Sequence, residues 1–144
     1  MSFRDNLRKG MVDRLQTLFP TIYGSSIDIE TENQRFDRVA NVPYMQVWFK
    51  QSASGRASIG TTMRFNRHNG YFMVACYVPE ESGTATLFKI ADAVIDCFEA
   101  THISLADNSD VTIEVPSMTT GALADGFYYT VVMVPYSVDS VPRQ

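Results

Sequence analysis

The residues that most often carry chemistry are sparse in this sequence. Its two histidines, His68 and His102, have no cysteine or second histidine at the spacing that metal ligands use. The glycine-rich patterns that bind phosphates or dinucleotides are absent, as are the HExxH and GxSxG patterns of hydrolases. The sequence therefore predicts no catalytic residue, no metal site and no cofactor, which argues against an enzyme.

Two groups of carboxylates were considered as acid–base or calcium sites. Glu80 and Glu81 follow Pro79, and adjacent carboxylates acquire altered pKa values only when they are buried together. Asp107 and Asp110 lie in a turn-rich stretch without the glycine and the later glutamate of a calcium loop. Both groups are predicted to be exposed loop residues.

The two cysteines, Cys76 and Cys97, lie in separate apolar runs and lack CxxC spacing. Such residues are typical of small buried side chains in a reducing compartment, and a disulfide is the alternative. The first 15 residues carry charges throughout, unlike a secretory signal, and no window is apolar enough to span a membrane. We expect a chain that is made and kept in the cytosol, without a membrane partner.

Composition indicates an ordinary folded domain. The 144 residues are 45% hydrophobic and 19% charged, which is typical of one globular unit. We predict a single domain over residues 1–144, with a loose tail at residues 137–144. A net charge of -4 argues against a dedicated nucleic-acid-binding protein, which would present a basic surface.

Two segments show the apolar spacing of amphipathic helices. The first is predicted to begin near residue 3 and to end at Pro20, and the second covers residues 84–100. The apolar positions are Phe3, Leu7, Met11, Leu15 and Leu18 in the first helix, and Leu87, Ile90, Ala91, Val94 and Phe98 in the second.

Alternating runs at residues 26–31, 44–50 and 111–115 predict β-strands. Residues 127–136 are apolar on both faces, which predicts a central strand or one covered by a partner. Asn69 and Gly70 form the strongest signal for a tight type I′ turn, so we predict a long hairpin over residues 61–78. In that hairpin His68 would face Tyr71 and Met63 would face Cys76. The predicted fold class is α+β, with a mixed, mainly antiparallel sheet, a long hairpin and two helices packed on one face.

Several stretches of this sequence resemble the tail-terminator (tail-completion) proteins of long-tailed bacteriophages. The resemblance lies in the order of an N-terminal helix, "NVPYMQVWF", "GYFMVACYVPEESG" and "ATLFKIADAVIDCFE", and it spans about residues 3 to 136. The matching positions are Gly70, Pro79, Gly83, Ala85, Ile90, Ala91, Asp92 and Phe98.

The resemblance implies a non-enzymatic structural protein of the virion tail, assembled in the host cytoplasm. It implies a hexameric ring that caps the tail tube, ends its polymerisation and offers the surface for head–tail joining. The implied partners are further copies of the chain, the tail-tube protein and a head-side connector, with DNA passing through without specific binding. The alternatives are another neck component, such as a connector or stopper, and a small ligand-binding or enzymatic α+β domain.

Two sets of residues are predicted to serve such an assembly. The long segments 32–43 and 116–126 are expected to contact neighbours or the tube, and Trp48 is either a second-side core residue or a partner contact. The acidic side of the second helix is expected to face the lumen. The partner-contact residues are Arg35, Phe36, Arg38, Trp48 and Leu123, and the lumen-facing residues are Asp92, Asp96 and Glu99.

Overall fold

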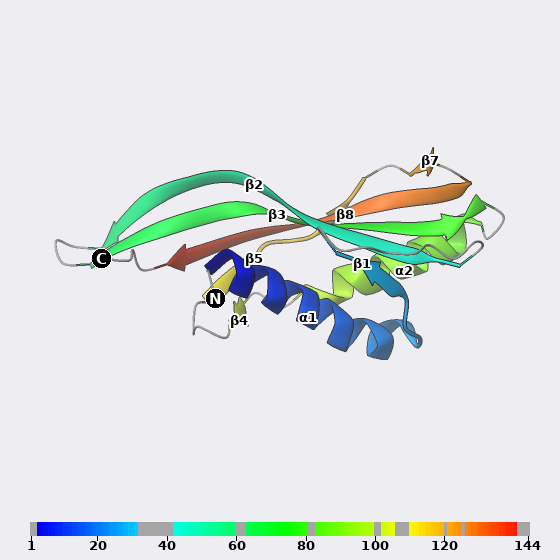
Figure 1. The fold of residues 1–144 in the computed structure, drawn as a ribbon, viewed down its shortest axis with the longest axis horizontal. Coiled ribbons are helices and arrows are strands. Elements are labelled where there is room, and N and C mark those ends of the chain that lie inside the picture. The colour runs from blue at the N-terminus through cyan, green and yellow to red at the C-terminus, as the bar shows by residue number, and fades with distance from the viewer. Residues whose placement is uncertain are drawn as a thin grey trace.

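Three long strands and two helices make up most of the molecule (Figure 1). The computed structural model describes residues 3–31, 42–59, 63–80, 83–99, 102–105, 110–119, 121–124 and 126–140. For residues 3, 4, 51–59, 63–67, 124, 139 and 140 it describes the backbone alone. The elements are α1 (Phe3–Tyr23), β1 (Asp28–Glu30), β2 (Tyr44–Ile59), β3 (Met63–Pro79), α2 (Thr84–Cys97), β4 (His102–Ser104), β5 (Asp110–Ile113), β6 (Ser117–Met118), β7 (Ala122–Ala124) and β8 (Phe127–Ser140).

The strands form one mixed, mainly antiparallel sheet. Its order is β1-β2-β3-β8-β5-β4, and the short strands β6 and β7 also pair with β8. Only the β1–β2 pair is parallel among the described pairs. The predicted α+β class is therefore confirmed.

Both helices lie on the same face of the sheet, as predicted (Figure 1). The apolar stripes of the two helices are buried against alternate residues of β2, β3 and β8, because side chains of a strand point to opposite faces in turn. Each large side chain buried in this way contributes about 1.5–3 kcal/mol to stability. The core includes Leu7, Met11, Leu15 and Phe19 of α1, Leu87, Ile90, Ala91 and Val94 of α2, and Met45, Val47, Phe72, Val74, Val132 and Val134 of the sheet.

The prediction that α1 ends at Pro20 was wrong by about one turn. The helix continues to Tyr23 because a proline still offers its carbonyl as an acceptor, and the Gly24 N–H donates to the Pro20 oxygen at 2.9 Å. The ring of Tyr23 stacks on that of Phe19 with centroids 5.1 Å apart, and Phe19 is buried in the core. Gly24, at φ +101°, then ends the helix in the left-handed conformation that favours glycine.

The hairpin prediction placed the turn at the wrong residues. β3 runs without interruption through Asn69 and Gly70, and Gly70 pairs with Gln51 on one side and Tyr136 on the other. The predicted pairing of His68 with Tyr71 does not form, because both residues belong to the same strand. The long hairpin is instead formed by β2 and β3, which pair antiparallel from Tyr44 with Tyr77 to Ile59 with Met63.

A close approach, and not a turn, explains the glycine at position 70. The β2–β3 register shifts between Gln51 and Ala53, which marks a β-bulge opposite this position. A Cβ atom on Gly70 would lie 2.7 Å from the Lys50 carbonyl oxygen and 2.7 Å from Oη of Tyr136. Glycine inside a strand is typical of such bulges and crowded sites.

The tail predicted to begin at residue 137 is in part a strand. β8 continues to Ser140, and its last four residues pair with Asn66–Asn69 of β3. Residues 141–144 lie outside the described part of the chain. β8 is central, with β3 on one side and β5, β6 and β7 in succession on the other.

We predict that Gly70→Ala lowers the free energy of unfolding by about 1–3 kcal/mol, because the added methyl group overpacks the bulge. Urea denaturation measures the loss. The same substitution in a Tyr136→Phe background should cost less, since one of the two obstructing atoms is then gone. An unchanged unfolding midpoint for Gly70→Ala would contradict the packing explanation.

Candidate functional surface

The sheet face opposite the helices is apolar and lacks a covering helix in the described structure (Figure 1). Trp48, Met73 and Met133 lie side by side on β2, β3 and β8, and each is half-buried. We call this surface the open face. Its half-buried residues are Gln46, Trp48, Tyr71, Met73, Tyr77, Tyr129, Val131, Met133 and Pro135.

One end of the open face carries a cluster of aromatic rings. Tyr77 lies between Tyr44 and Tyr129, with ring centroids 4.5 Å and 5.1 Å away and nearly parallel planes. Phe127 meets Tyr44 edge to face at 5.2 Å. The Tyr77 hydroxyl donates to Oε1 of Gln46 at 3.3 Å. Stacking of this kind holds large rings in fixed positions at low entropic cost, which suits a contact surface.

The chemistry of the open face favours a protein partner over a substrate. Among the described side chains of this face on β2, β3 and β8, Lys50 is the one charged residue, and Asp28 and Glu30 of β1 lie at the margin of the face, where they pair with Tyr44 and Gln46. A contiguous apolar surface on three strands is typical of an interface, and aromatic and methionine side chains are enriched at the centre of interfaces.

The outer edge of β2 is the second assembly feature. Among the described strands, only β1 borders this edge, and it pairs only with Tyr44–Gln46. From Lys50 to Ile59 the edge borders no described strand. A strand edge of this length is a template onto which a strand from another molecule can add.

The predicted partner-contact residues fall in different places. Trp48 lies on the open face beside Met73, and Leu123 on β7 is 63% exposed. The segment before β7 is tied to β8 by the Thr130 hydroxyl, which donates to the Thr119 carbonyl at 2.6 Å. Arg35, Phe36 and Arg38 lie outside the described residues. The roles of all five residues remain predictions.

The predicted lumen-facing residues all lie on the exposed side of the α2 region. The side chains of Asp92, Asp96 and Glu99 are exposed. Ala91, Ala93, Val94 and Cys97, on the other side of α2, are buried in the core. The position of the acidic side chains relative to a lumen remains a prediction.

Of the other acidic candidates, Glu80 is exposed at the end of β3, and Asp110 joins β5 instead of a loop. Asp110 Oδ2 lies 3.1 Å from Nδ1 of His102 on β4.

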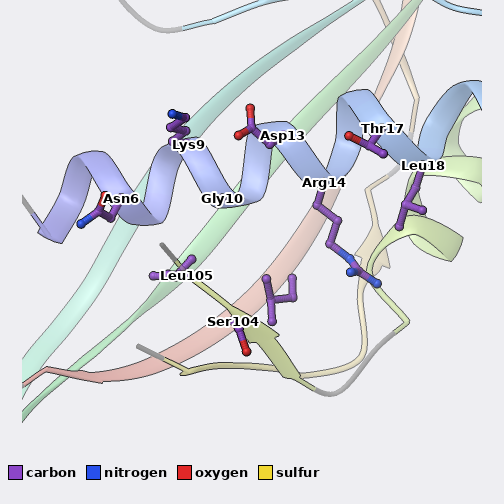
Figure 2. Close-up of a pocket in the computed structure, with 10 residues that line it drawn as sticks. Asn6, Lys9, Gly10, Asp13, Arg14, Thr17, Leu18, Ser104 and Leu105 are labelled. Atoms are coloured by element: carbon purple, nitrogen blue, oxygen red, sulfur yellow. The ribbon is translucent and has the colours of Figure 1, made fainter. Parts of the chain in front are cut away.

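The groove between α1 and β4 contains a side-chain contact that links the two helices. It has a volume of about 410 Å³, and Figure 2 shows Lys9 and Asp13 on the side of α1 away from Ser104 and Leu105. Arg14 points toward the end of α2, where its Nε donates to the Cys97 carbonyl oxygen at 2.7 Å. A cation at this position satisfies a terminal carbonyl and complements the helix dipole.

Both cysteines are buried and unbonded to each other, as predicted. Burial raises the pKa of Cys76 to about 12. Burial also raises the pKa of Cys97 to about 11, with Arg14 lowering it and Asp96 raising it to a smaller extent. These thiols are packing residues at neutral pH.

Metal and membrane features are missing from the described residues. No group of three or more His, Cys, Asp or Glu side chains there is arranged to hold a metal ion. None of the helices there has the length and apolar character needed to cross a membrane.

A strip-like sheet with one helix-covered face, one apolar face and an open edge defines a structural assembly protein of the α+β class. The family model of the phage tail terminator protein matches residues 6–138. The chain therefore belongs to the phage tail terminator family. This is a family of structural tail proteins and not of enzymes.

Two solved structures share the fold. One, known only by a sequence number, has a TM-score of 0.74 at 18% sequence identity and covers 99% of each chain. The other belongs to the virion of a native gene transfer agent particle, with a TM-score of 0.61 at 14% identity, covering 96% of this chain and 100% of that one. A comparison with curated protein sequences gave no match.

The raised cysteine pKa values predict that stability falls at alkaline pH. In the unfolded chain the thiols ionise near pH 9, whereas the folded thiols stay neutral until pH 11–12. Their contribution is therefore complete below pH 9 and is lost as the pH rises toward 11–12, by up to about 1.4 kcal/mol per pH unit for each thiol. Urea denaturation at pH 8, 9 and 10 should show a shallower decline for Cys76→Ala/Cys97→Ala than for the wild type. Parallel declines would contradict the prediction.

Proposed function

We propose that this protein caps the tail tube of a phage-type particle, ends its polymerisation and provides the surface on which the head docks. The proposed form is a hexameric ring. Membership of the tail terminator family supports this function, and the one structural observation that carries it is the open face. A face with Trp48, Met73 and Met133 at its centre leaves apolar area uncovered in one copy, and other subunits of the assembly are the proposed cover.

Ring formation needs a heterologous contact, in which one surface of a subunit meets a different surface of the next. The open face and the outer β2 edge are two such surfaces, and they adjoin along Trp48 and Lys50. Strand addition at that edge supplies main-chain hydrogen bonds, while the open face supplies apolar area. We assign Trp48 and Leu123, together with Arg35, Phe36 and Arg38, to contacts with neighbouring subunits or the tail tube.

The proposed partners are further copies of the chain, the tail-tube protein and a head-side connector protein. DNA passes through the ring without specific binding, and the exposed carboxylates of Asp92 and Asp96 on α2 are proposed to face it, since like charge would let it slide. The protein acts without catalysis, and it assembles in the host cytoplasm into the virion.

Deleting the gene tests the function directly. We expect electron micrographs of the deletion mutant to show overlong tails and free heads, because the tube is neither stopped nor given a docking surface. Expression of the wild-type chain from a plasmid should restore tails of normal length joined to heads. Normal particles in the deletion mutant would refute the proposal, and normal-length tails without heads would indicate a different neck component.

Charged residues on the open face should block assembly without unfolding the chain. We expect Met73→Lys/Met133→Lys to keep the thermal midpoint within a few degrees of the wild type, because both side chains are half-buried, and to fail in the same complementation assay. A matched control is Ile22→Lys on α1, where a 41% exposed apolar side chain lies away from this face. Full complementation by the double variant would exclude the open face as an interface.

A further inference from the structure

Charge is unevenly distributed along this chain. Residues 50–67 contain four basic residues, Lys50, Arg56, Arg64 and Arg67, and no acidic residue. The rest of the chain contains the other eight of the 12 Lys and Arg residues and all 16 Asp and Glu residues. The four basic residues belong to the end of the β2–β3 hairpin. We call residues 51–59 and 63–67 the arm.

The end of the arm extends beyond the other described strands. β8 is described as far as Ser140, opposite Asn66, and past that point Ala57–Ile59 of β2 and Met63–Phe65 of β3 pair with each other beside no other described strand. Figure 1 shows the arm projecting past the beginning of α1, at the end of the sheet away from α2. A two-stranded ribbon is marginally stable by itself in water, so its stable form is expected to be one covered by a partner.

An acidic groove with an apolar floor lies at a different place on the surface. It has a volume of about 670 Å³ and lies between the C-terminal end of α2 and the segment joining β5 to β6. Glu99 and Glu114 are its exposed carboxylates, and Val115 is 86% exposed although it is apolar. The remaining lining residues are Ile95, Phe98, Ile113 and Pro116.

We propose that the arm of one subunit occupies the acidic groove of the next subunit in the ring. This inference rests on the proposed function, which it deepens by naming the two surfaces that meet. Arginine forms bidentate contacts with carboxylates, so Arg56 and Arg64 would meet Glu99 and Glu114, while apolar residues cover Val115. Arg56 and Arg64 hold diagonally adjacent positions in the β2–β3 register, which places both residues on the same face of the ribbon.

Two observations favour a second copy over other occupants. The arm projects away from α2 within its own subunit, so it does not lie at its own groove (Figure 1). Glu99 and Glu114 line the groove and Asp96 is exposed in the preceding turn of α2, so the groove offers the basic arm a group of carboxylates. With the groove occupied, Glu99 faces a subunit instead of the lumen, and Asp92 and Asp96 remain the proposed lumen residues.

Charge reversal in both surfaces tests the pairing in the complementation assay. We expect Arg56→Glu/Arg64→Glu and Glu99→Arg/Glu114→Arg each to lower the yield of capped tails at least tenfold, and the combined fourfold variant to regain most of it. Lys9→Glu, a reversal on the exposed side of α1, serves as the control. If the arm contacts DNA instead, the reversed groove will not rescue the reversed arm, and the proposal fails.

Crosslinking separates this inference from the proposed function. The native thiols are buried, so Arg64→Cys/Val115→Cys introduces the accessible pair. Oxidation of capped tails should give a ladder of covalent oligomers up to the hexamer, whereas Arg64→Cys/Ile22→Cys should give none. Capped tails without a ladder would overturn the arm–groove contact alone, and failure of the wild-type chain to cap tails would overturn the proposed function itself.

Discussion

Packing of both helices on a single face of the long sheet is the constraint on which the rest of the structure depends. α1 and α2 bury alternate residues of β2, β3 and β8, and Arg14 joins the two helices by donating to the last carbonyl of α2. No third helix is present among the described residues, and neither described helix covers the opposite face of the same strands. The core thus fixes the position of the open face: every residue that points away from the helices on these strands belongs to it. One face of the sheet therefore carries the packing that stabilises the fold, and the opposite face carries the surface proposed for assembly.

The helices and the fold class were predictable because their signals are local. Apolar residues at three- and four-residue spacing predicted both helices, an alternating run predicted the strand at Tyr44, and a run that is apolar on both faces predicted the strand at Phe127. The hairpin was misplaced for a physical reason. The Asn-Gly pattern predicts a turn because both residues tolerate positive φ. Gly70 is instead needed because the Lys50 carbonyl and the Tyr136 ring leave no room for a Cβ atom. Tyr136 is 66 positions away in the sequence, so no local pattern shows that contact.

The open face was only partly visible in the sequence. Residues 127–136 are apolar on both faces, which indicated either a central strand or one covered by a partner, and the structure shows β8 to be central. Met73 and Met133 gave no separate signal, since their place beside Trp48 depends on the registers of two strand pairs. Knowledge of which face the helices cover is needed before any of these residues can be assigned to the surface. Of the residues predicted to contact partners, Trp48 lies on this face, and Leu123 is exposed on β7 at the edge of β8.

The basic character of the hairpin end also bears on whether two copies of the chain can pair edge to edge. A long unpaired strand edge invites indiscriminate pairing, and proteins commonly protect such edges with charged residues. The edge of β2 carries Lys50 and Arg56, and the adjacent strand carries Arg64 and Arg67, so two copies meeting edge to edge would bring like charges together. Such a contact is disfavoured, whereas approach to a surface lined with carboxylates is attractive over about 10 Å at ordinary ionic strength. Charge of one sign on the edge and of the other sign beside α2 would therefore favour the head-to-tail association of the proposed ring.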